Sequence, residues 1–139
     1  MQISQLTAQQ INQAVALWEA TGLTRPWNDP YADAQRALDT PTSTVLAVIE
    51  EDKVVSTAMV GHDGHRGWLY YVAVDPLKQG TGLGSTMVQA ATSWLVDRGV
   101  PKVQLMVRNE NAAVLNFYER LGFVDQNVVV LGKRLDAST

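Results

Sequence analysis

The sequence QGTGLG, residues 79–84, constrains the fold more than any other stretch of the chain. It follows YYVAVDP, an apolar run typical of a β-strand, and precedes STMVQAATSWLV, whose apolar residues recur at helical spacing. A strand that leads through glycines into a helix leaves backbone amides unpaired, and glycines let a bulky anion approach them. The pattern therefore indicates a phosphate or pyrophosphate site at the helix N-terminus. From these residues alone, a glycine-rich turn without a ligand is the alternative.

Spacing excludes two common phosphate-binding motifs. A P-loop needs a lysine between its last glycine and the following serine or threonine, whereas Ser85 follows Gly84 directly. A dinucleotide-binding fingerprint would need its third glycine where the chain has Ser85 or Met87. A phosphate ligand at this loop must therefore be held in another way.

The remaining patterns predict a single α+β domain over residues 1–139, since a chain of this length can bury one core. Helices are expected over 8–20, 31–39, 83–97 and 111–122, and strands over 1–6, 44–50, 54–62, 68–74 and 102–107, with a strand pair in 123–135. These strands predict a mixed, mostly antiparallel sheet of six to seven strands with about four helices. The strand–helix–strand unit over 68–107 requires one parallel, right-handed crossover.

Composition narrows the possible partners. The net charge is −3 and the sequence has no basic run, which argues against nucleic acid and anionic membranes as partners. The absence of cysteine excludes disulfides, thiolate metal sites and a thiol nucleophile. His62 and His65 lie in a glycine-rich turn without a third ligand nearby in sequence, so no metal is predicted. Without a signal-peptide pattern or a long apolar run, we expect a cytoplasmic protein.

Two motifs around the predicted crossover carry a family resemblance. Gln79, Gly82 and Gly84 match the loop signature, and Asn111, Tyr118 and the pair Gly122-Phe123 match the second element, of the GCN5-related N-acetyltransferase (GNAT) superfamily. The resemblance covers roughly residues 44–135. The segments LTRPWNDP, DGHRG and LGKRL also resemble the small bacterial YpeA-type acetyltransferases.

The resemblance implies an acetyl-CoA-dependent N-acetyltransferase. The pyrophosphate of coenzyme A is then held by the main chain of Gln79, Gly80, Thr81, Gly82, Leu83, Gly84 and Ser85. The pantetheine arm is expected to lie along Val72, Ala73 and Val74, where strands 68–74 and 102–107 separate. Asn111 is implied to hydrogen-bond this arm, and its other reading is the N-cap of the following helix.

Tyr118 is implied to donate a proton to the departing thiolate. This is chemically reasonable because a phenol with a pKa of about 10 is protonated at neutral pH. The other reading is an amphipathic core residue beside Phe117.

The acetyl acceptor is expected to be a small primary amine, such as an amino acid, bound by Trp27, Asn28, Asp29, Arg66 and Tyr70. Candidates for a general base are Glu50, Tyr70, Tyr71 and the His62–Asp63–His65 cluster, among which the sequence does not choose. Strand alternation places Tyr70 and Tyr71 on opposite faces. Two other functions stay open: a non-catalytic acyl-CoA-binding module, and acetylation of protein N-termini or lysines. The β-rich segment 127–131 suggests a homodimer.

Overall fold

The computed structural model describes residues 2–136, which divide into two compact units, one ending at Met106 and one starting at Val107. The first unit contains a five-stranded sheet. Its strands are β1 (Ile3–Gln5), β2 (Ser43–Glu50), β3 (Lys53–His62), β4 (Gly67–Val74) and β5 (Val103–Gln104), and they lie side by side in chain order. The first four are antiparallel and β4 pairs with β5 in parallel, which confirms the predicted mixed sheet and its crossover.

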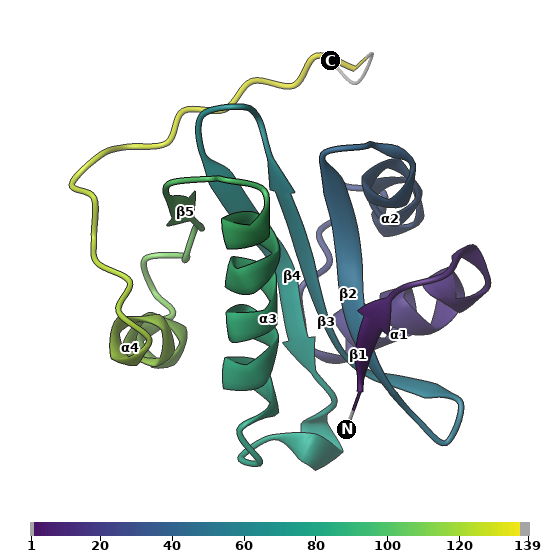
Figure 1. Cartoon of the computed structure of the whole chain (residues 1–139). Coiled ribbons are helices and arrows are strands. Elements are labelled where there is room, and N and C mark those ends of the chain that lie inside the picture. The colour runs from purple at the N-terminus through teal and green to yellow at the C-terminus, as the bar shows by residue number, and fades with distance from the viewer. Residues whose placement is uncertain (1, 137–139) are drawn as a thin grey trace. The chain divides into compact units, whose positions relative to one another are not determined.

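Helices cover both faces of this sheet (Figure 1). They are α1 (Ile11–Ala20), α2 (Pro30–Asp39) and α3 (Leu83–Asp97). Two 3-10 turns are also present: η1 (Ala8–Gln10) before α1, and η2 (Pro76–Lys78) after β4. On one face α1 and α2 bury Trp18, Val15 and Ala34 against the sheet. On the other face α3 packs against β3 and β4 through buried residues that include Met87, Val88 and Leu95. The described chain has no helix that is both long and apolar enough to cross a membrane.

Contact between α3 and β4 is close at Gly67. A Cβ placed on this residue would come within 2.5 Å of a methyl group of Leu95, which is itself 2% exposed. Any larger residue here needs the Leu95 side chain or α3 to shift, so glycine is favoured by space rather than by backbone conformation. The crossover helix lies directly against the start of the strand that it follows.

The second unit contains α4 (Ala112–Arg120) and an extended segment after it. The predicted strand pair in 123–135 was wrong, because no strand forms in the described residues after α4. Local hydrogen bonds replace strand pairing: Asp125 accepts from the amide of Asn127 at 2.8 Å, and Asn127 has a φ of +55°. Such side-chain bonds to the backbone compete with a ladder. The described sheet thus has five strands where six to seven were expected.

Candidate functional site

The parallel pairing of β4 with β5 is short. Gly67 lies opposite Val103 and Trp68 lies opposite Gln104, and the two strands form no further pair. From Leu69 to Val74, β4 therefore has β3 on one side and no strand on the other among the described residues. The expectation that the parallel strands do not pair along their whole length is confirmed. An unpaired edge of this kind can accept an extended ligand that carries amide groups.

The glycine loop continues from this edge into α3. Gly80 and Gly82 both have a φ of +82°, and Gly82 is the N-cap residue of α3. A Cβ added at either position would meet nothing within 4 Å, so the space beside both glycines is open. The amides of Leu83, Gly84 and Ser85 open the helix, and within the described residues they donate to no acceptor. The arrangement fits an anion.

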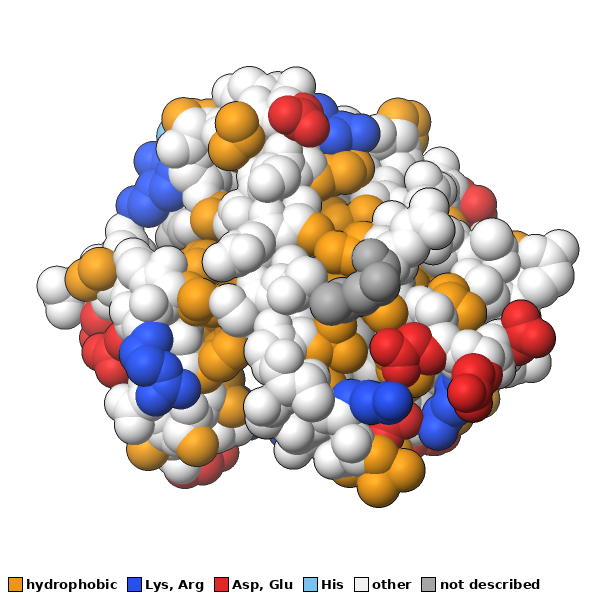
Figure 2. Space-filling view, turned by 60° about the horizontal axis from the view of Figure 1, so that its bottom comes forward, with side chains coloured by type: hydrophobic (Ala, Val, Ile, Leu, Met, Phe, Trp, Pro, Cys, Tyr) orange, Lys and Arg blue, Asp and Glu red, His pale blue; other side chains and the backbone are white. Residues whose placement is uncertain are grey.

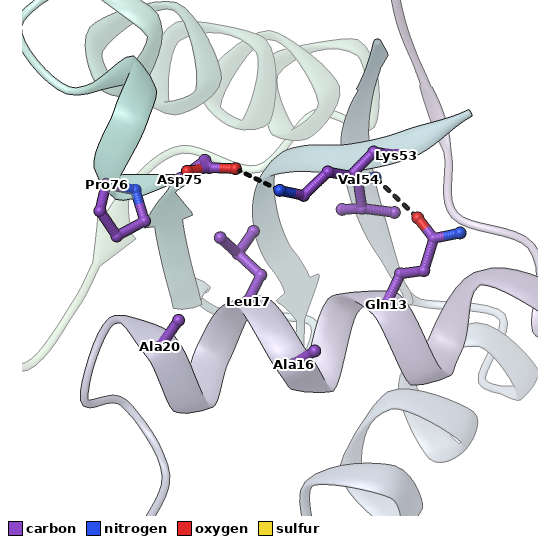
Figure 3. Close-up of a pocket in the computed structure, with 8 residues that line it drawn as sticks. All are labelled: Gln13, Ala16, Leu17, Ala20, Lys53, Val54, Asp75 and Pro76. Carbon is purple, nitrogen blue, oxygen red and sulfur yellow. Dashed lines mark hydrogen bonds and ion pairs between the residues drawn. The ribbon is translucent and has the colours of Figure 1, made fainter. Parts of the chain in front are cut away.

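Asp75 anchors the start of this loop. Its backbone amide donates to the carbonyl of Val55 at 2.8 Å, and its side chain accepts from the amide of Leu77 at 2.9 Å. Its other carboxylate oxygen lies 3.1 Å from the Lys53 ammonium, an ion pair visible in Figure 3. The Leu77 amide, together with Lys53, lowers the pKa of this carboxyl below its usual value.

A second ion pair joins the same two segments. The Lys78 ammonium lies 3.0 Å from Glu50, and this contact raises the pKa of Lys78. Lys53 and Glu50 flank the tight β2–β3 turn, so the hairpin end holds the chain from Asp75 to Lys78 by two contacts. The segment that leads into the glycine loop is therefore tethered to the sheet.

A hollow of about 240 Å³ lies beside this tether. Figure 3 shows that Gln13, Ala16, Leu17 and Ala20 line it from α1, with Lys53, Val54, Asp75 and Pro76 opposite. The side-chain oxygen of Gln13 is already engaged in a hydrogen bond, because it accepts from the amide of Val54 at 2.8 Å. The hollow is mostly apolar and holds none of the predicted site residues.

The predicted placement of Tyr70 and Tyr71 on opposite faces was wrong. Thr57 lies opposite Ala73 and Met59 lies opposite Tyr70, so β4 has one residue more than β3 between these pairs. This is a β-bulge, and it shifts the alternation of side chains. Tyr71 has a φ of +48° and stacks on Trp18, on the side of the sheet that α1 covers. Tyr70 belongs to the same side, because its partner Met59 belongs to the core cluster that contains Trp18.

Tyr71 is therefore no free base. Its hydroxyl donates to Asp33 at 2.8 Å, and burial together with this bond raises its pKa far above the ordinary value. Tyr70 is 42% exposed and stacks on Trp68. Burial, with a smaller contribution from the Asp63 charge, raises its pKa too, so it stays protonated at neutral pH.

The other candidate bases have structural partners. Glu50 is paired with Lys78, as described above. Asp63 accepts from the amides of Arg66 and His65 in the β3–β4 turn, and these bonds lower its pKa. The ring of His62 lies 6.1 Å from that of Trp94, centroid to centroid. Among the described residues no group of three or more histidines or carboxylates is placed to hold a metal ion.

The residues predicted for acceptor binding lie in three places: Trp27, Asn28 and Asp29 before α2, Arg66 in the β3–β4 turn, and Tyr70 in β4. Trp27 is 55% exposed, and Asp29 caps α2 by accepting from the amides of Tyr31 and Ala32. Arg66 lies in the β3–β4 turn and donates to the carbonyl of His65 at 3.1 Å. Acidic and basic side chains are interspersed on the face shown in Figure 2, and no extended basic area is visible there.

In the second unit, Asn111 caps α4. Its side chain accepts from the amide of Val114 at 3.3 Å, as the alternative reading predicted. Tyr118 is 8% exposed and lies edge-on to Phe117 and Phe123, at centroid distances of 4.9 and 5.5 Å. Burial raises its pKa to about 12, so the phenol is protonated throughout the neutral range.

The structure also identifies residues that sequence reasoning missed. Trp18, Thr57 and Asp33 all contact Tyr71 or each other through hydrogen bonds or ring stacking. The available signal was the pair Ser56-Thr57, two hydroxyl residues inside an otherwise apolar strand. Both are fully buried.

Several solved structures have a similar fold. The chain is similar in fold to an aminoglycoside N-acetyltransferase, AAC(6')-Iy, solved in complex with CoA, with a TM-score of 0.82 and 15% identity over 97% of this chain and 95% of that one. It is also similar to glucosamine-6-phosphate N-acetyltransferase from Arabidopsis thaliana, with a TM-score of 0.74 and 21% identity over 97% and 98% of the two chains.

A third similar structure is an aminoglycoside acetyltransferase from an uncultured soil metagenomic sample, solved with sisomicin. Its TM-score is 0.80, with 19% identity over 97% of this chain and 96% of that one. The model of the acetyltransferase (GNAT) family matches residues 12–123. This match covers most of the chain and includes both the glycine loop and Tyr118. The chain therefore belongs to the GNAT family of acetyl-CoA-dependent N-acetyltransferases.

Proposed function

We propose that this protein transfers an acetyl group from acetyl-CoA to a primary amine of a small molecule. The observation that carries the proposal is the continuity of the unpaired β4 edge, the open glycine loop and the free amides of α3. Oriented amides at a helix N-terminus suit a diphosphate, and an unpaired strand edge suits an amide-bearing arm. Acetyl-CoA carries both groups in one molecule.

The cofactor-binding residues proposed from the sequence keep their roles in this proposal. The amides of residues 79–85 hold the diphosphate, and the backbone of Val72, Ala73 and Val74 holds the arm. Two features support this: the left-handed glycines expose main chain, and no strand covers the outer side of Val72–Val74 in the described residues. Asn111 caps α4, which is compatible with a further hydrogen bond to the arm because an amide side chain has several donors and acceptors.

Tyr118 is proposed as the general acid. The neutral amine nitrogen bonds to the acetyl carbon, the carbon–sulfur bond breaks, and the Tyr118 hydroxyl gives its proton to the departing thiolate. The acylated nitrogen releases one proton to solvent, and the Tyr118 phenolate takes one proton back from solvent. A raised pKa of about 12 supports this role only in part: it keeps the proton in place before transfer, but it also makes the phenol a weaker acid. The chain has no cysteine to carry an acetyl group, so direct attack by the amine is the proposed route.

The acceptor is proposed to be a small amine with a modest pKa. Deprotonating a lysine-like amine at pH 7 costs about 4–5 kcal/mol, whereas an α-amine costs about 1–2 kcal/mol. Glu50 and Asp63 are engaged by an ion pair and a turn, so an acceptor that needs little help from a base is favoured. Trp27, Asn28, Asp29, Arg66 and Tyr70 are the proposed contacts, with Arg66 facing a carboxylate.

One experiment separates this function from its alternatives. Free-thiol release from acetyl-CoA is measured with a panel of α-amino acids, amino sugars, lysine-containing peptides and peptides with free N-termini. The proposal expects turnover with small amines and little with peptides. Turnover only with peptides would favour protein acetylation. Binding of acetyl-CoA by calorimetry with no turnover on any amine would favour a non-catalytic module, and no binding would overturn the proposal.

Three further statements stay predictions from the sequence: a single domain over residues 1–139, a homodimer, and a place in the cytoplasm. The single domain is supported by the family match, which runs across the boundary between the two units. The proposed homodimer draws on the exposed residues Val128 to Leu131.

A further inference from the structure

The β4 bulge is held by a chain of hydrogen bonds that begins in α1. The indole N–H of Trp18 donates to the Thr57 hydroxyl at 2.8 Å, and this hydroxyl donates to the carbonyl of Tyr71 at 2.8 Å. Trp18 and Thr57 are both 0% exposed. One hydroxyl thus accepts from a helix and donates to a strand, and it uses its only proton to do so.

Tyr71 itself occupies a costly conformation. A φ of +48° is rare for a bulky residue and persists only where the surroundings determine it. The Tyr71 ring lies 3.9 Å from that of Trp18 at an angle of 15°, and its hydroxyl is bonded to Asp33 of α2. The residue is therefore held at its ring, its hydroxyl and its carbonyl.

A second hydroxyl acts one residue earlier on β3. Ser56 is fully buried and donates to the carbonyl of Ala73 at 2.7 Å. Side-chain hydroxyls thus bind two carbonyls of β4 at the bulge, where the extra residue disrupts the regular ladder. Val72, Ala73 and Val74, the backbone proposed to hold the cofactor arm, directly follow Tyr71, and the Ser56 bond falls on Ala73 within this segment.

We infer that Thr57 is a positioning residue for the proposed transfer: through Tyr71 it sets the backbone of Val72–Val74 against which acetyl-CoA lies. The inference rests on the proposed function. Thr57 touches neither substrate in this scheme and acts only through the carbonyl that it binds. Its loss allows the bulge to relax, so the strand edge is less well prepared for the arm.

The chain provides a matched control for the test. Thr44 on β2 is 4% exposed, and its hydroxyl has no hydrogen-bond partner within the described residues. Thr57→Val and Thr44→Val remove the same atoms from the same kind of buried strand, but only the first breaks two hydrogen bonds. Thr57→Ser keeps the hydroxyl. Tyr71→Phe, which loses only the bond to Asp33, is a milder second variant should Thr57→Val not fold.

The experiment combines steady-state kinetics with amide hydrogen exchange of the ligand-free protein. We expect Thr57→Val to raise the KM for acetyl-CoA about fivefold or more, the size of one lost hydrogen bond, and to speed exchange at residues 71–74. Thr44→Val and Thr57→Ser are expected to behave as the wild type in both measurements. Tyr71→Phe is expected to shift both in the same direction as Thr57→Val, by less. General destabilisation would lower the active fraction and kcat while leaving KM unchanged.

Two failures are distinguishable. A wild type that does not bind acetyl-CoA overturns the proposed function before any variant is compared. A wild type that binds and turns over normally, with a KM for Thr57→Val equal to that of Thr44→Val, overturns this inference alone. Faster exchange at residues 71–74 without a change in KM does so as well, because it shows a purely structural role.

Discussion

The rings of Trp18 and Tyr71 stack 3.9 Å apart, one from the last turn of α1 and the other from the bulge in β4. Offset aromatic pairs contribute about 0.5–1.5 kcal/mol beyond the area that they bury. Here the contact also joins α1 to the strand whose free edge forms the proposed binding surface. Stability and the shape of that edge are therefore linked through one pair of side chains.

Tyr118, which is buried, and Tyr71, which is half-buried, predict a loss of stability in alkali. Burial raises the pKa of Tyr118 to about 12 and that of Tyr71 further, whereas tyrosine in the unfolded chain ionises near pH 10. Because the folded state holds these protons longer, the contribution of the two tyrosines to the free energy of unfolding is constant below about pH 10 and falls above it. Urea titrations between pH 8 and 11 measure this. In Tyr71→Phe the free energy of unfolding should fall less steeply above about pH 10. An unchanged fall would contradict the conclusion that the raised pKa of Tyr71 contributes to it.

Tyr118→Phe tests the general acid. The variant keeps the ring contacts with Phe117 and Phe123, so we expect normal folding and little change in acetyl-CoA affinity. Loss of a positioned proton donor typically lowers turnover by about 10²–10⁴-fold. Steady-state kinetics with calorimetry of acetyl-CoA separate the two effects. Full turnover in the variant would remove Tyr118 from the mechanism.

Gly82→Ala tests the loop against Gly99→Ala. Gly99 follows α3, has a φ of +74° and, like Gly82, has open space where a Cβ would lie. Both variants are expected to lose about 1–2 kcal/mol of stability through the left-handed backbone alone. Only Gly82→Ala is expected to weaken acetyl-CoA binding, by tenfold or more in calorimetry, because its methyl group stands over the proposed diphosphate site. Equal affinities in the two variants would argue against the loop as the binding site.

Asp75 predicts a loss of stability in acid. The Leu77 amide and Lys53 lower its pKa in the folded protein, so its contribution is present above the unfolded pKa and is lost as the pH falls through the folded one. This window lies below about pH 4. Asp75→Asn should therefore unfold with a weaker acid dependence, measured by circular dichroism between pH 2 and 5. A wild-type acid profile in this variant would show that other carboxylates dominate.

Arg66→Ala examines the acceptor pocket. If Arg66 pairs with a carboxylate of the acceptor, the KM for an amino acid rises, while that for the corresponding amino acid amide does not. Initial rates with both compounds give the comparison. The acetyl-CoA KM serves as an internal control, because the β3–β4 turn has no proposed contact with the cofactor. An unchanged acceptor KM would place recognition elsewhere.

Local patterns predicted most of the fold in the first unit. The helix over 83–97 begins and ends where predicted, because its apolar periodicity and the flanking glycines agree. The β2–β3 hairpin was also found, since Glu51 and Asp52 form a tight turn between two β-rich runs. Segment 127–131 has the same β-rich character but no partner strand among residues 2–136, which shows that β-propensity alone does not make a sheet.

The candidate site was less predictable where pairing decides geometry. The loop glycines were identifiable because their φ values demand that residue type. The bulge at Tyr71 was not, because it arises from the register between β3 and β4 rather than from the residues themselves. Consequently, the alternation rule misplaced Tyr71, and the contacts of Trp18, Thr57 and Asp33 were found only in the structure.

The close approach at Gly67 limits how this domain can change. A methyl group at position 67 would come within 2.5 Å of a methyl group of Leu95, so either the buried Leu95 side chain or α3 itself has to move. Where the packed Leu95 side chain does not move aside, a larger residue at position 67 pushes α3 outward, and α3 carries at its opposite end the amides proposed to bind the coenzyme. A small substitution at position 67 can therefore change the position of the proposed coenzyme-binding amides, even though these lie at the other end of α3.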